Sequence, residues 1–418
     1  MASQFTPGHI GVIGAGIVGV STALYLQRDG HRVTIFDAGG PGEGTSFGNA
    51  SVIARNSAEP VAMPGIIWRV PGMLMDPLGP LAIRWQYLPK LMPWLVQFVL
   101  ASRKWRVEEI SKAMHAISKD SITAYRTLTG EIGIDDMIVE RGWLSVYGSD
   151  HSFAEAQTEL DLLKRRGNQF EILKKDEIRQ FEPTVGNQFA HAVWHKDYAH
   201  TVDNLGRVQR MAQHFLQRGG KHVRERVEDF VIGPKGPTHV VTSVGQHAVD
   251  GVVVAAGAWS KPLSAKLGHW VPLDVERGYH VMLPNAGVVP RLPVHMGDHG
   301  FVATPLNGGL RFAGTVELGG LEAAPNWKRA EVLLKHGTRV FPTVNTSDRR
   351  YWMGFRPSVP DSVPVISGGR HPNAWFAFGH GHLGLTNGAV TGRLIADMVA
   401  GRTPDIDMAP YRIDRPWN

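Results

Sequence analysis

The sequence predicts an α/β fold in which one lobe is built on a mostly parallel sheet and a second lobe, of α+β type, on an antiparallel sheet. Three observations support this prediction. A glycine-rich turn joins an apolar run to a helical pattern over 9–28, a second apolar run ends at Gly257, and another glycine-rich loop precedes a helical run at 379–399. A strand that enters a helix through a short glycine-rich turn is the unit from which parallel sheets are assembled.

The first element is predicted to be a strand–helix–strand unit. His9 to Ile13 is short and mostly apolar, a helical pattern continues to Arg28, and Arg32 to Phe36 forms a second strand that ends at Asp37. The turn between the first strand and the helix has the spacing Gly-x-Gly-x-x-Gly. Its residues are Gly14, Ala15, Gly16, Ile17, Val18 and Gly19.

Each glycine of this turn has a physical role in holding a dinucleotide. Gly14 permits the tight turn, Gly16 lets a pyrophosphate approach the backbone, and Gly19 lets the helix pack closely on the strand. The free N–H groups at the helix N-terminus attract the phosphates. Asp37, eighteen residues after Gly19, is placed to accept hydrogen bonds from an adenosine ribose. The unit is therefore predicted to be Rossmann-like, and the acid argues against a 2′-phosphate, which leaves NAD or FAD.

The segment 250–260 favours FAD. It is a strand that enters Ala-Ala-Gly, and it is similar to the second characteristic strand of FAD-binding two-dinucleotide folds. A helix is predicted before it at Asn204 to Gln217, followed by a strand at Lys221 to Arg226. A simple NAD-dependent dehydrogenase would not need this arrangement so far after the first motif. The cofactor contacts predicted here are Val227, beside adenine, and Ala256, Gly257 and Trp259.

A third element is predicted near the C-terminus, where the strand Trp375 to Phe378 precedes the loop 379–384 and a helix at Thr386 to Val399. A glycine-rich loop that opens a helix presents N–H groups and a positive dipole end, which stabilise the negative charge that a flavin gains on reduction. The predicted contacts are Gly381, His382, Leu383 and Gly384. Flanking glycines and the lack of nearby acids argue against a metal pair of His380 and His382, so no metal site is predicted.

Composition excludes several classes of chemistry. The chain has 418 residues, a formal charge of +6 and no cysteine. Disulfides, thiolate metal sites, cysteine nucleophiles and a flavin tethered through cysteine are therefore ruled out, and the predicted FAD is non-covalent. The basic residues are scattered, so nucleic acid is not an expected partner, whereas a positive balance favours an anionic substrate or membrane face. Neither a secretory signal nor an apolar run of about 20 residues is seen, so the predicted location is the cytoplasm.

At this point the chain resembles the D-amino-acid dehydrogenase and glycine/sarcosine oxidase group of FAD-dependent amine oxidoreductases. The resemblance extends over essentially the whole chain. Within the group it is most similar to the bacterial branch that includes glyphosate oxidoreductase. The stretches that carry the group resemblance are 10–37, 45–50, 252–260, 354–357, 360–364 and 379–384, and those that carry the branch resemblance are 76–80, 92–95, 276–280, 324–330 and 352–357.

The resemblance implies roles for particular residues. Arg356, in Phe-Arg-Pro, matches the arginine that clamps the substrate carboxylate, a task suited to a guanidinium because it is always charged and two-pronged. Arg277 and Tyr279 lie in a strand expected to line the substrate lobe, where binding and structural roles are both open. His382 is a further candidate for substrate binding. The residues expected near the flavin are Ala38, Thr45, Ser46, Asn49, Ala50, Ser51 and Arg356, with Ser51 standing where many relatives carry glycine.

The implied organisation is discontinuous. The FAD-binding lobe is expected from roughly 8–60, 142–265 and 350–405, and the substrate lobe from roughly 61–141 and 266–349. Strand character at Val275 to Leu283 and Gly309 to Glu317 agrees with an antiparallel sheet in the substrate lobe. Residues 233–237 are predicted to form a turn between two strands of the adenine-side region.

The segment Trp85 to Leu100 has two interpretations. Apolar residues recur at helical spacing with Pro89 and Pro93 among them, which favours a helix buried against the substrate lobe. The other interpretation is a peripheral contact with the inner face of the membrane near Trp94 and Phe98, which would suit electron transfer to a quinone.

The predicted function is FAD-dependent oxidative deamination of a small anionic or zwitterionic amino acid. The resemblance favours a D-amino acid, which loses a hydride from its α-carbon to flavin N5 and becomes an imine that hydrolyses to a 2-oxo acid. No catalytic base is assigned, because positioning by Arg356 suffices for this scheme. The alternatives are a sarcosine- or glyphosate-like secondary amine, and a flavin-binding electron-transfer subunit. The electron acceptor, oxygen or a quinone, stays open.

Overall fold

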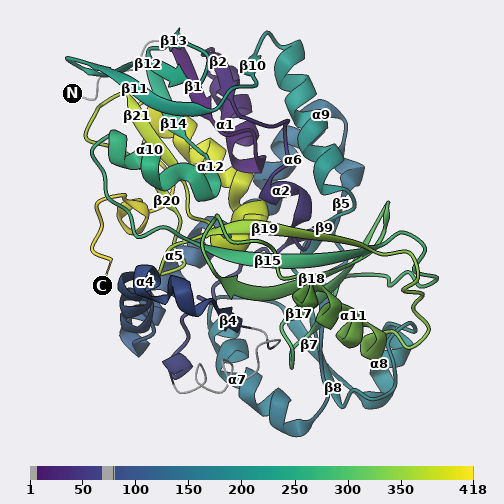
Figure 1. Cartoon of the computed structure of the whole chain (residues 1–418). Coiled ribbons are helices and arrows are strands. Elements are labelled where there is room, and N and C mark those ends of the chain that lie inside the picture. The colour runs from purple at the N-terminus through teal and green to yellow at the C-terminus, as the bar shows by residue number, and fades with distance from the viewer. Residues whose placement is uncertain (1–6, 68–78, 80, 418) are drawn as a thin grey trace.

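The computed structural model describes residues 7–67, 79 and 81–417. Its two lobes are stacked, with a parallel sheet above a larger antiparallel sheet (Figure 1). The six-stranded upper sheet has the order β10-β2-β1-β14-β21-β20 and is parallel except for β20. Its strands are β1 (His9–Ile13), β2 (Arg32–Phe36), β10 (Lys221–Val223), β14 (Gly251–Val254), β20 (Val365–Gly368) and β21 (Ala374–Phe378).

Helices cover one face of this sheet and a small sheet covers the other. The helical face carries α1 (Ile17–Arg28), α5 (Lys104–Ser118), α6 (Ser121–Ile132), α9 (Asn204–Gln217) and α12 (Gly384–Val399). In α9 the buried residues Val208, Met211, Ala212 and Phe215 recur at the spacing of one helix face, and the Asp203 side chain caps the helix by accepting from Gly206 N at 2.9 Å. The opposite face carries α10 (Ser260–Lys266) and the sheet β11 (Val227–Gly233), β12 (Gly236–Thr242) and β13 (Gln246–Ala248).

The lower lobe is a nine-stranded sheet in which β19-β15-β18-β17-β16-β6-β8-β7 follow one another and β4 pairs with β18. These strands are β4 (Leu81–Ile83), β6 (Trp143–Tyr147), β7 (Phe170–Lys174), β8 (His191–His195), β15 (Asp274–Leu283), β16 (Val294–Met296), β17 (Phe301–Leu306), β18 (Gly309–Leu318) and β19 (Arg350–Ser358). The outer face packs on α11 (Lys328–Val340), where Gly337 lets the Phe312 ring approach to 2.0 Å from the place of a Cβ. The inner face of the sheet faces the upper lobe.

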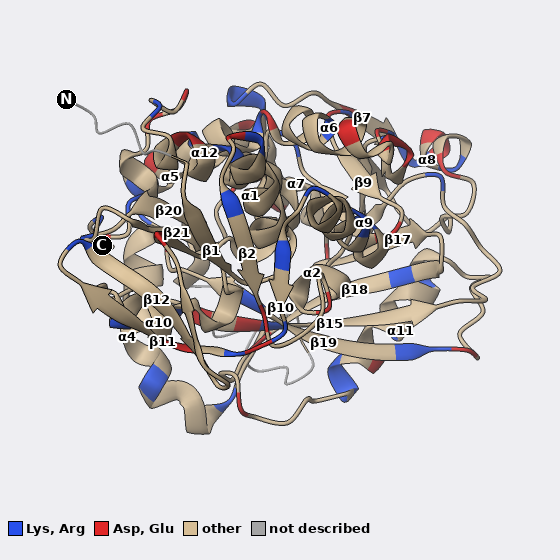
Figure 2. Cartoon of the chain, turned by 90° about the horizontal axis from the view of Figure 1, so that it is seen from above, with Lys and Arg blue, Asp and Glu red and all other residues tan. Residues whose placement is uncertain are grey.

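The remaining elements connect or flank the lobes. The short strands β3 (Val52–Ile53), β5 (Ile138–Val139) and β9 (Ala199–Thr201) form a third small sheet. The other helices are α2 (Thr45–Gly48), α4 (Leu88–Ala101), α7 (Asp150–Arg165) and α8 (Lys175–Phe181). Lysine and arginine are spread among acidic residues over both lobes (Figure 2). None of the helices in the described ranges combines the length and apolarity needed to cross a bilayer.

The α/β fold with a discontinuous antiparallel-sheet lobe is confirmed, but the pairings correct the predicted division of the chain. Strands β6, β7 and β8, assigned to the FAD-binding lobe within 142–265, belong to the nine-stranded sheet, as does β19 from 350–405. Helices α5 and α6, assigned to the substrate lobe within 61–141, pack in the core of the upper lobe. Local periodicity predicts a strand or a helix, but the sheet edge or core that it joins depends on contacts between distant segments.

Of the two interpretations of α4, the structure supports the buried helix at Trp94, where a membrane contact was the other expectation. Leu91 and Trp94 are buried against Leu318 of β18. The Trp94 indole donates to the carbonyl of Ser358 at 3.3 Å and stacks on Phe98 at 5.1 Å. A membrane contact through Trp94 is therefore wrong, since its ring is already covered by protein.

Candidate active site

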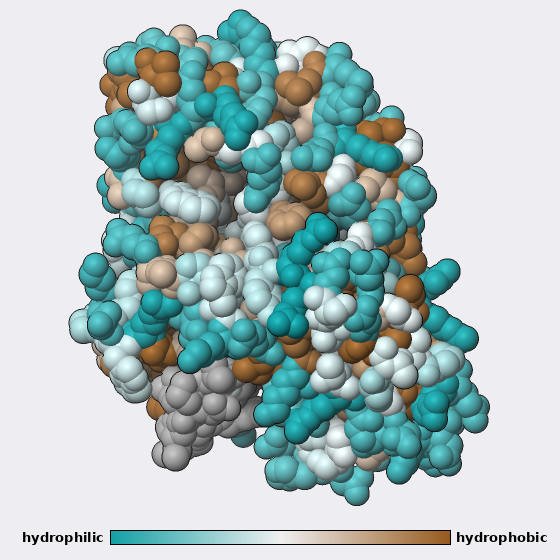
Figure 3. Space-filling model, turned by 45° about the vertical axis from the view of Figure 1, so that its right-hand side comes forward, coloured by the Kyte–Doolittle hydropathy of each residue, from teal (hydrophilic) through white to brown (hydrophobic). Residues whose placement is uncertain are grey.

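A cavity of about 1110 Å³ lies where the two lobes meet, and both contribute to its wall. Figure 3 shows the molecular surface hollowed between the upper and lower parts, with hydrophobic residues in the recess and hydrophilic ones around it. The predicted cofactor and substrate residues that line the cavity are Gly14, Ala15, Gly16, Ile17, Val18, Asp37, Ala38, Thr45, Ser46, Asn49, Ala50, Val227, Ala256, Gly257, Trp259, Arg356, Gly381, His382, Leu383 and Gly384. Most of the predicted site is thus brought together in one space.

The β1–α1 turn fits the phosphates of a dinucleotide. Gly14 has a φ of 117°, and a Cβ there would lie 2.3 Å from the Ala255 carbonyl oxygen. Gly16 is the N-cap of α1 and has no side chain that could bond to the helix, so the N–H groups that follow Ile17 in the first turn stay available to an anion. The hydroxyl of Ser46 accepts from Ile17 N at 2.9 Å and ties the 45–51 loop to this helix end.

Asp37 is held in place by the backbone that surrounds the same turn. Its Oδ2 accepts from Ala15 N at 2.7 Å and its Oδ1 from Gly39 N at 2.8 Å. Each carboxylate oxygen has a second lone pair, so both can still accept from a ribose hydroxyl. Val227 lines the cavity beyond Asp37, with Glu225, Arg226 and Glu228 beside it.

Two of the predicted cofactor residues do not line the cavity. Gly19 acts in packing, because a Cβ there would lie 1.9 Å from the Gly14 carbonyl oxygen. Ser51 is fully buried and has a φ of 66°, a left-handed conformation that favours glycine. Its N–H donates to Asn49 Oδ1 at 2.7 Å, so Ser51 shapes the loop behind the cavity wall. Gly19 and Ser51 therefore shape the cavity wall from behind the residues that line it.

Arg356 enters the cavity from β19 through a gap left by glycine. A Cβ on Gly278 of β15 would lie 2.1 Å from Nη2 of Arg356. Nη1 donates to the carbonyl of Thr315 at 2.9 Å. Thr315 has a φ of 58° and lies at an irregularity in the β15–β18 register, which turns its carbonyl toward the guanidinium.

Glu276 is the counter-charge of this cluster. It pairs in register with Arg356, accepts from the Ser358 hydroxyl at 2.7 Å and lies 3.0 Å from Nε2 of His382. Burial alone would raise the pKa of Glu276, but His382, Ser358 and Arg356 outweigh it and lower that pKa to about 2. Burial lowers the pKa of Arg356, and Glu276 opposes that effect. The cluster therefore keeps a buried carboxylate charged beneath the cationic wall of the cavity.

Arg277 and Tyr279 do not reach the cavity. Arg277 is fully buried and donates to the carbonyls of Gly320 at 2.7 Å and Ala323. The Tyr279 hydroxyl bonds to Glu317, on the side of the sheet that packs on α11. Residues alternate between the two faces of a strand. Because Gly278 lies on the face toward the cavity, the side chains of Arg277 and Tyr279 point away from the cavity. The prediction that they help to bind substrate is wrong. Their contacts are those of residues that stabilise the sheet, which was the other role considered for them.

The loop before α12 brings two histidines into different surroundings. Both line the cavity, but His382 is 41% exposed, whereas His380 is buried and bonds to the Thr391 hydroxyl at 2.9 Å. Burial lowers the pKa of His380 to about 3, so it is neutral at physiological pH. Within the described residues no group of three histidine or acidic side chains could hold a metal ion.

Trp352 of the cavity wall lies in a stretch that carries the branch resemblance, but the sequence suggested no role for it. Trp352 inserts between Gly48 and Gly354, whose Cβ atoms would lie 2.0 and 1.9 Å from its ring, and stacks on His280 at 5.0 Å. Burial lowers the pKa of His280 to about 3, with a further contribution from Arg311. Gly48 and Gly354 were the available hint, because a glycine permits the close approach of a neighbouring side chain.

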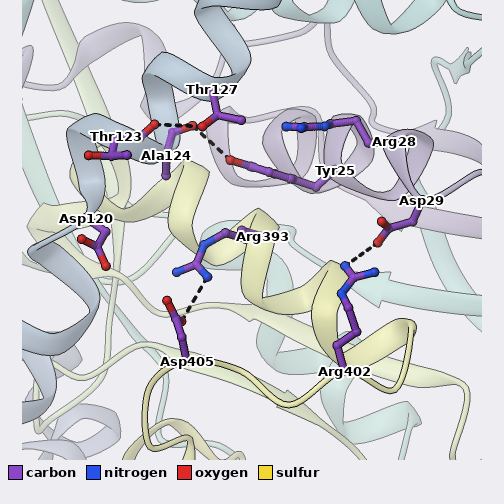
Figure 4. Close-up of a pocket in the computed structure, with 10 residues that line it drawn as sticks. All are labelled: Tyr25, Arg28, Asp29, Asp120, Thr123, Ala124, Thr127, Arg393, Arg402 and Asp405. Carbon is purple, nitrogen blue, oxygen red and sulfur yellow. Dashed lines mark hydrogen bonds and ion pairs between the residues drawn. The ribbon is translucent and has the colours of Figure 1, made fainter.

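A second hollow is separate from this cavity. It lies between α1, α6 and α12 and is lined by the ten residues drawn in Figure 4. Arg393 pairs there with Asp405 at 3.0 Å, and Arg402 pairs with Asp29 at 2.7 Å. Arg28, the third arginine of its wall, pairs with Glu131 at 3.4 Å. Because all three arginines have acidic partners, the hollow offers no unpaired cation to an anion.

The glycine-rich turn before α1, the aspartate placed to bind a ribose and the cavity between the lobes define a two-lobed dinucleotide-binding protein. The family model described as "FAD dependent oxidoreductase" (DAO) matches residues 9–398, and the chain belongs to this family. The predicted FAD, the oxidoreductase activity and the oxidation of an amine are confirmed. The cradle at Gly14, the open end of α1 and the doubly anchored Asp37 all fit FAD.

Among known relatives, the D-amino-acid oxidase of Bradyrhizobium diazoefficiens is 42% identical over 96% of this chain and 97% of its own. A D-amino acid dehydrogenase of Paramagnetospirillum magneticum is 31% identical over 97% and 98%. Among solved structures, glycine oxidase from Geobacillus kaustophilus has a TM-score of 0.73 at 20% identity over 98% and 99%. Iminodiacetate oxidase from Chelativorans sp. BNC1 has a TM-score of 0.71 at 21% identity over 96% and 98%. At these identities the two structures show the fold.

Proposed function

We propose that this chain oxidises the Cα–N bond of a D-amino acid and holds the substrate carboxylate on Arg356. The observation that carries the proposal is the guanidinium at the cavity wall, with Nη1 fixed by the Thr315 carbonyl and Nη2 directed over Gly278. A guanidinium with further N–H groups available can hold a carboxylate in one orientation. The relatives named D-amino-acid oxidase and D-amino acid dehydrogenase support the choice of substrate.

Bound FAD supplies the acceptor of the α-hydride at flavin N5. The chain itself supplies orientation and electrostatics. Arg356 fixes the carboxylate, so the α-carbon of the substrate is presented in one geometry. The N-terminus of α12, at Gly384 with no side-chain cap, points N–H groups at the cavity and stabilises negative charge that develops there. The substrate reacts as the neutral amine, after its ammonium has lost a proton to water, so no protein base is required. Loss of the hydride would leave an iminium, which water hydrolyses to a 2-oxo acid and ammonium.

The alternative, a glyphosate-like substrate with two anionic ends, would need a second cation. Among the described residues that line the cavity, the basic ones are Arg356 and Arg226. Arg226 lies next to Val227, at the end assigned to adenine. The cavity wall therefore favours a substrate with one carboxylate. A sarcosine-like amine, which has a single carboxylate, stays an alternative.

The remaining partners belong to the same proposal. The reduced protein passes its electrons to oxygen or to a quinone, and it acts in the cytoplasm. If the acceptor is a membrane quinone, the protein binds to the inner face of the membrane. Met92 and Val96, which are 45% and 52% exposed on α4, are the apolar side chains of that helix available for such a contact. Reoxidation of the reduced protein by air and by a soluble quinone distinguishes the two acceptors.

The test is anaerobic flavin absorbance with D-alanine, L-alanine, sarcosine and N-phosphonomethylglycine. The proposal expects bleaching by D-alanine and none by L-alanine. Bleaching by sarcosine or the phosphonate alone would reject the D-amino acid and favour the secondary-amine alternative. Bleaching by none of the four, in a protein that carries its flavin, would favour an electron-transfer subunit.

A further inference from the structure

The cavity extends well beyond Arg356 along the inner face of the nine-stranded sheet. Arg356 starts on β19 and reaches β18 at Thr315, whereas His295, which also lines the cavity, lies on β16. Strands β18 and β16 are separated by β17, so the two positions are two strand spacings, about 10 Å, apart. Val302 of β17 lines the wall between them. The space beyond the carboxylate position therefore has an apolar passage and a distant end.

Five residues form that distant end, and we name them the acidic aromatic box: Glu59, Trp143, His195, Tyr198 and His295. All of them line the cavity. The Trp143 ring lies 5.9 Å from Tyr198 in a T-shaped contact and 5.0 Å from His295, and His195 stacks on Tyr198 at 5.2 Å. They come from β6, β8, β16 and the loops around residues 59 and 198, so no local pattern joins them.

Glu59 is the acidic member of the box, and Glu159 of α7 also lines the cavity close enough to raise the pKa of Tyr198, as Glu59 does. Oε2 of Glu59 accepts from Ala58 N at 2.8 Å, and the groups that favour its ionised form are backbone N–H groups and the Ser57 hydroxyl, all of them neutral. Burial raises the pKa of the Glu59 carboxyl above its ordinary value even though these hydrogen bonds lower it, so its ionised form lacks a compensating charge. No ion pair joins Glu59 to a lysine or arginine of the described residues. A carboxylate in this position is stabilised by a cation that a ligand brings.

The histidines of the box do not compete with such a cation. Burial lowers the pKa of His195 to about 3, with a contribution from His295, and burial lowers the pKa of His295 to about 4. Both rings are therefore neutral at physiological pH. Trp143 donates to Ser145 Oγ at 2.7 Å, and that hydroxyl lies 3.3 Å from Nδ1 of His295, so the rings are held in fixed orientations. Aromatic faces around a carboxylate are the surroundings that recognise ammonium and guanidinium groups.

We infer that the acidic aromatic box is the side-chain subsite of the proposed reaction and that it selects D-amino acids with a long, cationic side chain, such as D-lysine and D-arginine. This inference rests on the proposed function. The carboxylate binds at Arg356, the methylenes pass over Val302, and the terminal cation meets Glu59. Glu59 is thus a specificity-determining residue that takes no part in the bond changes at the α-carbon.

The experiment compares D-lysine with D-norleucine, which has a similar shape without the ammonium group, in the FAD-loaded protein. The inference expects kcat/KM to be at least about tenfold higher for D-lysine, because a charge-assisted hydrogen bond to a carboxylate is lost with D-norleucine. Glu59→Gln should reduce the D-lysine to D-norleucine ratio by about tenfold, and Glu59→Asp should restore part of it. The matched control is Glu331→Gln, an exposed glutamate of α11 on the other side of the sheet.

The outcomes separate the two proposals. Equal kcat/KM for D-lysine and D-norleucine, together with turnover of D-alanine, would overturn the inference and leave the proposed function intact. A Glu59→Gln ratio equal to that of wild type would also overturn it. Flavin reduction by no D-amino acid would overturn both. If Glu59→Gln lowers Tm, Tyr198→Phe and Trp143→Leu provide a second comparison, in which loss of the Trp143 ring should reduce the ratio more than loss of the Tyr198 hydroxyl.

Discussion

The guanidinium of Arg356 occupies the place that a side chain at Gly278, on the neighbouring strand, would take. The place where a Cβ of residue 278 would lie is 2.1 Å from Nη2 of Arg356 and 2.2 Å from Cζ. No real pair of atoms can approach so closely without a shift, and the shift would fall on the guanidinium because Gly278 lies within the sheet. The path of the substrate-binding arginine therefore depends on the absence of a side chain opposite it.

Gly278→Ala should raise the substrate KM by roughly 10- to 100-fold, since a guanidinium displaced by about 1 Å loses its two-pronged contact. Flavin content should be unchanged, because Gly278 belongs to the substrate sheet. The measurement is steady-state kinetics with D-lysine, with Gly245→Ala as a control, since nothing lies within 4 Å of a Cβ there. An unchanged KM in Gly278→Ala would show that the arginine has another path.

Arg356→Ala should raise KM by about 100-fold or more while FAD stays bound, because the carboxylate loses a charged, bidentate partner. Arg356→Lys should recover part of the loss, since a lysine keeps the charge but not the fork of donors. Anaerobic titration of the flavin bands measures both effects. Wild-type affinity in Arg356→Ala would contradict the assignment of the carboxylate site.

Glu276→Gln tests the counter-charge beneath the site. The folded pKa of Glu276, about 2, is below its ordinary value of 4.5, so its ionised form stabilises the fold above pH 4.5 and that stabilisation is lost as the pH falls toward 2. Glu276→Gln should therefore lower Tm near neutral pH, and the difference from wild type should shrink between about pH 5 and pH 2. The buried neutral histidines affect both proteins alike, so the difference isolates Glu276. A Tm difference independent of pH would contradict this account.

Arg402 links the end of α1 to α12 away from the cavity. It lies 2.7 Å from Asp29 and 2.7 Å from Asp397 (the Asp29 pair is drawn in Figure 4). Arg402→Ala should lower the free energy of unfolding by about 1 kcal/mol, the scale of a networked surface pair, without changing KM. Arg412→Ala is the control, because Arg412 pairs with Asp414 only two residues away and joins no separate elements. Denaturant unfolding of the two variants gives the comparison, and equal losses would refute a bridging role.

The sequence was sufficient to predict individual helices, strands and turns. The helix at Asn204–Gln217 and the strand at Arg32–Phe36 have the predicted bounds, because a period of 3.6 or 2 in apolar residues is set by the chain itself. The glycines that need a positive φ or a close approach, such as Gly14, were recognisable for the same reason. The predicted turn over 233–237 likewise separates β11 from β12.

The sequence by itself was enough to predict the dinucleotide cradle and the ribose-binding acid Asp37 of the upper lobe, and it placed Arg356 in a recognisable motif without showing that β19 belongs to the other sheet. Tertiary structure decided which sheet β6, β7, β8 and β19 joined and which face of β15 held Gly278 rather than Arg277. It also decided that Glu59, Trp143 and His295, which are far apart in the chain, line one cavity. Such neighbours are fixed by packing between distant segments and by strand register, and a local pattern carries no record of either.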